Sequence, residues 1–255
     1  MFIDTHCHLH DEKLVDLDAV VKDYTLCGVS KVINVACCAK TSEMGKGIAE
    51  KYPSVFFMTG CHPSDVSGFD EQEFDRISAL TVHEKCVAVG EIGLDYHWPG
   101  FDKEQQQKAF IKQIELAYAS KLPISIHSRD ATADTLKILK ENKGKLIYGA
   151  VMHCFSGSVE TAREILNLGL YISFAGPLTF KNARSLIDVA EYVPVDRCIT
   201  ETDCPYLAPN PLRGTVNSPK NVPIIAARLA EIKKMETVCL AEQILTNARR
   251  LFTKL

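Results

Sequence analysis

Two histidines close to the start of the chain, His6 and His8, have the spacing of side chains that act together. They follow the apolar residues 1–3, which predict a buried strand. Side chains at positions i and i+2 of an extended chain point to the same side, so we expect both imidazoles to face one point while Cys7 faces away. Two imidazoles that point to the same place can bind a divalent metal ion together. The alternative is a surface turn in which the histidines share no partner.

Four more polar residues follow apolar, β-rich runs further along the chain. They are Glu91 in VAVGEIGLDYH, His127 in PISIHSRDA, His153 in VMHCFSGS and Asp203 in CITETDCPYL. Any one of them alone would fit a rim or core position without a metal. Their shared place is the stronger signal, because the carboxyl ends of the strands in a parallel barrel form a single rim. We therefore expect six nitrogen and oxygen ligands from five strands to meet there.

Six ligands are too many for one tetrahedral ion and suit two ions that share a carboxylate, which we expect to be Glu91. The other ligands would form two groups, His6, His8 and Asp203 around one ion and His127 and His153 around the other. Imidazole-rich sites favour zinc, manganese, iron or nickel, and magnesium remains an alternative. Two ions roughly 3.5–4 Å apart can activate water and hold both oxygens of a phosphoryl centre. We expect Asp203 to hold and deprotonate that water.

The elements that must position these residues are short apolar runs alternating with longer amphipathic stretches. The predicted strands are residues 2–4, 31–36, 55–59, 86–90, 123–126, 148–152, 170–174 and 197–200. The helix-like segments include residues 103–120, 131–141, 159–168 and 222–234. Strands alternating with helices predict parallel βα units. Eight units in one chain predict an α/β fold, a single (β/α)8 barrel of the TIM type over residues 1–255, with the metal site at the carboxyl rim. An open, doubly wound sheet is the alternative.

Composition excludes several other classes of protein. The chain is 46% hydrophobic, so it can build a sizeable core. A formal charge of -3 without a long basic run disfavours tight gripping of duplex nucleic acid. Ten cysteines without a Cys-x-x-Cys pair indicate free thiols in a reducing compartment. With no apolar run of membrane-spanning length and no signal-peptide pattern, we expect a cytoplasmic protein with no membrane contact and no obligate protein partner.

The same residues, in their sequence context, resemble the TatD-like metal-dependent deoxyribonucleases, which are amidohydrolase-type metallohydrolases. The similarity covers essentially the full length and lies in eight ordered stretches, FIDTHCHL, GCHP, GEIGLDY, PISIHSRDA, HCFSGS, SFAGP, TETDCPYLAP and NARRLF. It implies a TIM-type barrel, divalent metals and hydrolysis of nucleic-acid phosphodiesters, often from an end. The metal ligands of the family correspond to the six residues above. The stretch NSPKNVP departs from the family's usual Arg-Asn-Glu-Pro run, which leaves substrate contacts around Asn217 open.

Three further residues are candidates for substrate binding, together with Asn217. His62, in GCHP, could contact a phosphate or donate a proton to the leaving group, or be a loop histidine beside Pro63. Arg129 could pair with a phosphate or with a carboxylate on a helix. Glu201 could anchor the ligands from behind or bind a further ion.

Three functions compete at this point. The first is a two-metal phosphodiesterase, an exonuclease on single-stranded DNA ends, because an unpaired end enters a rim pocket without unstacking a duplex. The second keeps the metals and cleaves esters or amides, including aminoacyl-tRNA esters or a small metabolite. The third is a non-enzymatic scaffold, against which an intact ligand set argues. We favour the first.

Overall fold

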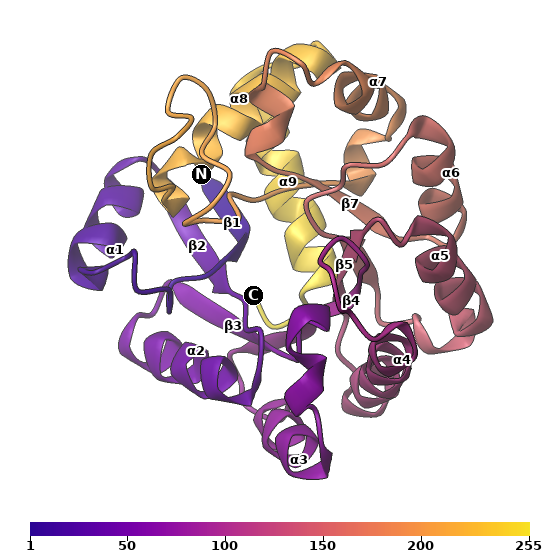
Figure 1. Cartoon of the computed structure of the whole chain (residues 1–255). Helices are drawn as coiled ribbons and strands as arrows, with labels where there is room; N and C mark the ends of the chain where they lie inside the picture. Colours follow the sequence, from indigo (N-terminus) through magenta and orange to yellow (C-terminus); the bar gives the residue numbers. More distant parts are fainter.

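A computed structural model describes all 255 residues as a ring of eight parallel strands surrounded by helices (Figure 1). The strands are β1 (Phe2–Cys7), β2 (Val29–Asn34), β3 (Val55–Thr59), β4 (Cys86–Asp95), β5 (Ile124–Arg129), β6 (Ala150–Met152), β7 (Tyr171–Phe174) and β8 (Cys198–Thr200). The α-helices are α1 (Leu17–Leu26), α2 (Ala39–Lys51), α3 (Glu71–Leu80), α4 (Lys103–Ser120), α5 (Thr132–Glu141), α6 (Val159–Asn167), α7 (Arg184–Tyr192), α8 (Val222–Lys233) and α9 (Thr237–Leu251). Sequential strands are neighbours throughout. The predicted (β/α)8 barrel is confirmed.

The barrel is closed between β8 and β1 by the chain that follows β8. The amide of Asp203 donates to the carbonyl of His6 at 2.9 Å, and the amide of His8 donates to the carbonyl of Cys204 at 2.7 Å. Below these bonds, Asp4 accepts hydrogen bonds from the amide and the hydroxyl of Thr202, at 2.9 and 2.5 Å. The segment after β8 is therefore fastened directly to the strand that carries the first two histidines.

The other end of the barrel is covered by α9, which lies behind the centre of the ring in Figure 1. Asn247 on this helix is buried and donates to the carbonyls of Val195 and Cys198, both at 2.8 Å, at the start of β8. Lys254 reaches the carbonyls of Thr81 and His83, before β4. These bonds fasten α9 and the residues after it across the amino ends of the strands.

Three strands extend further than the sequence pattern predicts. β1 continues through His6, β4 through Glu91, and β5 through His127, although we expected these residues to follow their strands. The prediction stopped where the apolar run stopped. In the barrel, pairing continues into the polar rim, where Gly93 lies opposite His127 and Asp95 opposite Arg129. Tertiary pairing supplies the hydrogen bonds that the local pattern does not indicate.

Several outer helices begin at a side-chain cap, which fixes where each loop ends. Asp16, Asp70, Asp102 and Ser158 accept hydrogen bonds from the first turns of α1, α3, α4 and α6. The caps satisfy backbone amides that would otherwise lack partners. None of the helices is both long enough and apolar enough to cross a membrane.

Candidate metal centre

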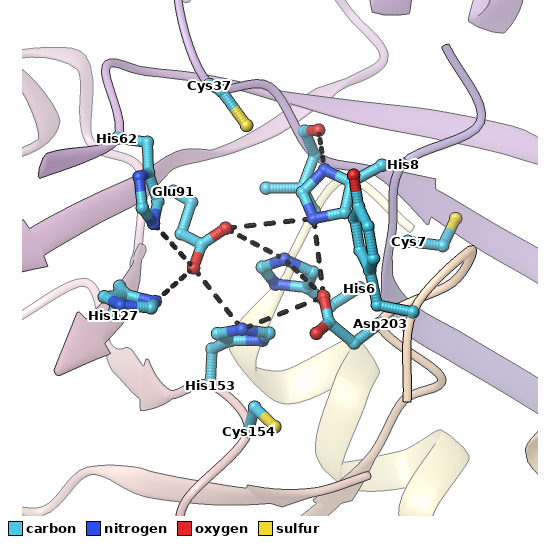
Figure 2. Close-up of polar contacts among 12 residues, drawn as sticks. His6, Cys7, His8, Cys37, His62, Glu91, His127, His153, Cys154 and Asp203 are labelled. Atoms are coloured by element: carbon cyan, nitrogen blue, oxygen red, sulfur yellow. Dashed lines mark hydrogen bonds and ion pairs between the residues drawn. The ribbon is translucent and has the colours of Figure 1, made fainter. Parts of the chain in front are cut away.

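The carboxyl rim of the barrel gathers the six predicted ligands into one cluster, in which four are buried and His127 and Asp203 are partly exposed (Figure 2). They arrive from separate strands and the loops directly after them, namely His6 and His8 from the β1 end, Glu91 from β4, His127 from β5, His153 after β6 and Asp203 after β8. Residues nearly two hundred positions apart in the sequence therefore lie in contact. No local element could assemble this set without the barrel.

The carboxylate of Glu91 stands at the centre of the cluster and presents its two oxygens to different histidines. Oε2 lies 3.3 Å from Nε2 of His6 and 3.9 Å from Nε2 of His8. Oε1 lies 2.7 Å from Nδ1 of His127 and 3.3 Å from Nε2 of His153. Figure 2 shows the two groups on opposite sides of this carboxylate. The two oxygens of Glu91 thus face two different pairs of histidines, although the rings of His6 and His153 also stack with their centres 3.6 Å apart.

Asp203 lies on the side of Glu91 that faces the first two histidines. Its Oδ1 is 3.4 Å from Nε2 of His8 and 3.8 Å from Nε2 of His6. The same oxygen is 4.0 Å from Nε2 of His153. Asp203 therefore lies closer to His6 and His8 than to His153.

Three histidines face the centre with one ring nitrogen. The second nitrogen of each ring contacts a residue on the outer side, which holds the ring in place. Nδ1 of His8 is 2.9 Å from the carbonyl of Val35. Nε2 of His127 is 3.2 Å from Oδ2 of Asp95, and Nδ1 of His153 is 2.9 Å from Oε1 of Glu201 as an ion pair. Such outer partners fix the ring orientation and the tautomer of metal-binding histidines.

The charges of the cluster suit a set of metal ligands. Burial opposes ionisation of Glu91, but the neighbouring His153, His62 and His6 outweigh it and hold the pKa of Glu91 well below its usual range. The pKa of Asp203 is likewise lowered, against its burial, by the hydrogen bond with His8 and by nearby histidines. Both carboxylates are therefore ionised, as a metal ligand must be.

The histidines differ in their protonation. Burial also disfavours the charged form of His153, yet the charges of Glu201 and Glu91 raise its pKa to about 10. Burial lowers the pKa of His6, and its Nε2 is buried without a hydrogen-bond partner. A buried imidazole nitrogen packed against two ionised carboxylates is the kind of donor set that a divalent cation prefers. The residues present therefore fit a divalent metal.

The four candidates for substrate binding differ in where they lie relative to the centre. His62 belongs to the centre, with Nε2 3.7 Å from Oε1 of Glu91, and burial lowers its pKa to about 4. Arg129 is exposed at the rim and pairs with no carboxylate; its guanidinium carbon lies 5.4 Å from the ring centre of Trp98. Of the two alternatives for Arg129, the pairing with a helix carboxylate is therefore absent, and the contact with a phosphate remains a prediction.

Glu201 and Asn217 lie behind the centre, and neither lines the cavities beside it. Glu201 accepts a hydrogen bond from the amide of Cys154 at 2.6 Å as well as facing His153. Asn217 is fully buried and donates to the carbonyls of Thr202 and Tyr206, at 3.0 and 2.7 Å. In this arrangement both residues position the loops that carry His153 and Asp203.

Two carboxylates that contact the residues around the centre, Asp95 and Asp4, were not assigned a role from the sequence. Asp95 lies four positions after Glu91 on the same strand and orients His127. Asp4 lies two positions before His6 and fastens Thr202, next to Asp203. Both have an even spacing from a predicted ligand on an extended strand, and this spacing is the signal that would have identified them.

Comparison with known proteins is consistent with this geometry. The family model described as TatD related DNase matches residues 3–253. The chain is 42% identical, over 99% of its length and 99% of the relative's, to the uncharacterized metal-dependent hydrolase YabD of Bacillus subtilis. It is 38% identical to the metal-dependent hydrolase YcfH of Escherichia coli K12, covering 98% of this chain and 95% of the relative. The solved structure of YJJV, a TatD homologue from Escherichia coli K12, superposes with a TM-score of 0.94 at 30% identity, covering 99% of this chain and 98% of that one.

Proposed function

This chain belongs to the TatD-related DNase family of metal-dependent hydrolases, and we propose that it cleaves phosphodiester bonds at single-stranded DNA ends with two bound divalent ions. The observation that carries the proposal is the Glu91 carboxylate, whose two oxygens face two separate groups of histidines. A shared carboxylate between two sets of nitrogen ligands is what a pair of ions requires. His6, His8 and Asp203 would hold one ion, His127 and His153 the other, with Glu91 between them.

Bound at these residues, the ions would supply Lewis acidity and lower the pKa of a water molecule. The protein's own contribution is to place a base beside that water. Oδ1 of Asp203 faces the histidines, while Oδ2 takes part in no hydrogen bond or ion pair, and the residue lines a cavity of about 410 Å³. Oδ2 is therefore free to accept the proton as the water attacks phosphorus.

The shape and charge around the centre favour a strand end as the substrate. The cavity over Asp203 also includes Arg129 and Tyr206 in its wall, which places one exposed guanidinium where a phosphate of the substrate would lie. A net charge of -3 and the lack of a long basic run in the sequence disfavour tight binding of duplex DNA. An unpaired end can enter this cavity without the free-energy cost of unstacking a helix.

The test is cleavage of end-labelled single-stranded DNA by the wild-type protein and by Asp203→Asn, each supplied with manganese, magnesium or zinc. We expect stepwise shortening by the wild type and a loss of about 100-fold or more in the variant, in line with removal of a general base. Asp196→Asn is the matched control, because Asp196 is exposed at the end of the barrel that α9 covers and should leave turnover unchanged.

Two results would contradict parts of the proposal. Full activity of Asp203→Asn would remove Asp203 as the base. No cleavage of DNA by the wild type, with metal shown to be bound, would point to an ester or amide substrate, such as an aminoacyl-tRNA ester, on the same barrel.

A further inference from the structure

A second cavity, of about 390 Å³, lies beside the metal centre between α5 and α6. Its size falls within the roughly 300–1,000 Å³ typical of small-molecule sites. It shares wall residues with the cavity over Asp203, namely Ser128, Arg129, His153 and Ser156. A group held in the second cavity can therefore be covalently joined to a group held at the metal centre.

The lining of this second cavity combines apolar surface with hydroxyl groups. Its apolar walls are Leu136, Met152, Phe155 and Ile165. Its hydroxyls are those of Ser128, Thr132, Thr135, Ser156 and Thr161. Hydroxyls can both donate and accept hydrogen bonds, so they satisfy varied polar edges without selecting one pattern.

The cationic groups of the cavity wall, Arg129 and His153, lie on the side that it shares with the metal-centre cavity. Asp130 at its edge is paired with His97, whose Nδ1 lies 2.8 Å from Oδ2 of Asp130. Arg129 is the only arginine or lysine in the wall, and it also borders the metal-centre cavity. Away from Arg129 and His153 the lining carries no unpaired charge, so a flat, uncharged group with polar edges fits that part of the cavity.

We propose that the cavity between α5 and α6 holds the base of the terminal nucleotide, while the phosphate attached to it lies at the metal centre. This inference rests on the proposed function and adds where the end of the strand is recognised. It also implies little preference among the four bases, because hydroxyls and apolar walls accept any of them.

The only tryptophan of the chain offers a direct reporter of this cavity. Trp98 is 56% exposed, and it lies beside two residues of the cavity wall, Arg129 at 5.4 Å and His97 with ring centres 5.1 Å apart. A base that enters the cavity should therefore change the fluorescence of Trp98.

The experiment titrates the manganese-loaded protein with deoxyadenosine monophosphate and with deoxyribose 5-phosphate, which has the same sugar and phosphate but no base. We expect saturable quenching by the first compound, and at least tenfold weaker binding of the second, measured by competition. Thr132→Phe and Thr161→Phe fill the cavity from opposite walls and should each abolish this difference. Thr246→Phe, on the exposed face of α9, is the matched control and should keep it.

A parallel measurement uses single-stranded DNA whose terminal nucleotide is normal or abasic. The wild type and Thr246→Phe should cleave the normal end about tenfold faster than the abasic end, or more. In both cavity variants the ratio of the two rates should approach one. Equal binding of the two small compounds, or an unchanged ratio in both folded cavity variants, would overturn the inference even if DNA is cleaved. If no phosphodiester is cleaved, the proposed function fails, and the fluorescence comparison still decides whether the cavity takes a base.

Discussion

At the scale of single residues, the chemistry of this site depends on side chains that hold other side chains. Glu201 is buried behind His153, and the two form an ion pair at 2.9 Å. Asp95 holds His127 in the same way, at 3.2 Å. The ring nitrogens that face Glu91 are therefore oriented before any ligand arrives, which reduces the entropic cost of binding one.

Glu201→Gln tests this orienting role. The amide keeps the size of the side chain but removes the charge that faces His153, so we expect the metal concentration for half-maximal turnover to rise about 10- to 100-fold. Excess metal should restore much of the turnover. Glu242→Gln, on the exposed face of α9, serves as the matched control. A variant with reduced turnover but an unchanged metal dependence would show that Glu201 acts only through the stability of the loop.

At the scale of elements, the two ends of the barrel have different tasks. The carboxyl rim is closed by the segment after β8, which is hydrogen-bonded to β1 and carries Asp203 to His8. The opposite end is covered by α9, whose Asn247 donates hydrogen bonds at the start of β8. Stability and catalysis should therefore respond separately to substitutions at the two ends.

Asn247→Ala tests this separation. The substitution leaves the carbonyls of Val195 and Cys198 without their donor inside the protein, and we expect a loss of about 2 kcal/mol in the free energy of unfolding. Urea denaturation measures that loss, with the exposed Asn167→Ala as control. Turnover per folded molecule should stay unchanged, because the bonds that Asn247 makes lie at the start of β8, at the opposite end of the barrel from the rim. A loss of turnover in a fully folded variant would contradict the separation.

At the scale of the whole molecule, metal binding and folding should be linked. The six candidate ligands come from five strand ends, so they meet only in the folded barrel. An ion that binds the folded state alone stabilises it by about 2.7 kcal/mol when present at 100 times its Kd. For a chain of this size, that corresponds to a rise in Tm of roughly 5–10 °C.

The check is a thermal denaturation of the chelator-treated protein before and after addition of manganese or zinc. We expect the added metal to raise Tm by the amount above, and Glu91→Gln to lose most of that rise, because the shared carboxylate is gone. An equal rise in the variant would mean that the stabilising ion binds elsewhere on the molecule.

Much of this organisation was predictable from the sequence, because it depends on patterns among residues that are close in the sequence. Alternating apolar runs and amphipathic stretches predict eight βα units, and a parallel barrel of such units places residues such as Glu91 and Asp203 at one rim. The family resemblance is confirmed by the comparison with known proteins. The residue types themselves indicated metal chemistry, since the preference of imidazole and carboxylate for divalent ions does not depend on the fold.

Other features were decided only by the tertiary structure, because they depend on contacts between elements distant in the sequence. Polar pairing carries β4 and β5 beyond their apolar runs. The packing of strand ends determines which oxygen of Glu91 faces which histidine, and it turns Glu201 and Asn217 inward to hold loops. The cavity between α5 and α6 likewise exists only because two helices meet beside His153. Local sequence determines what a side chain can do, whereas barrel closure and register determine what it meets.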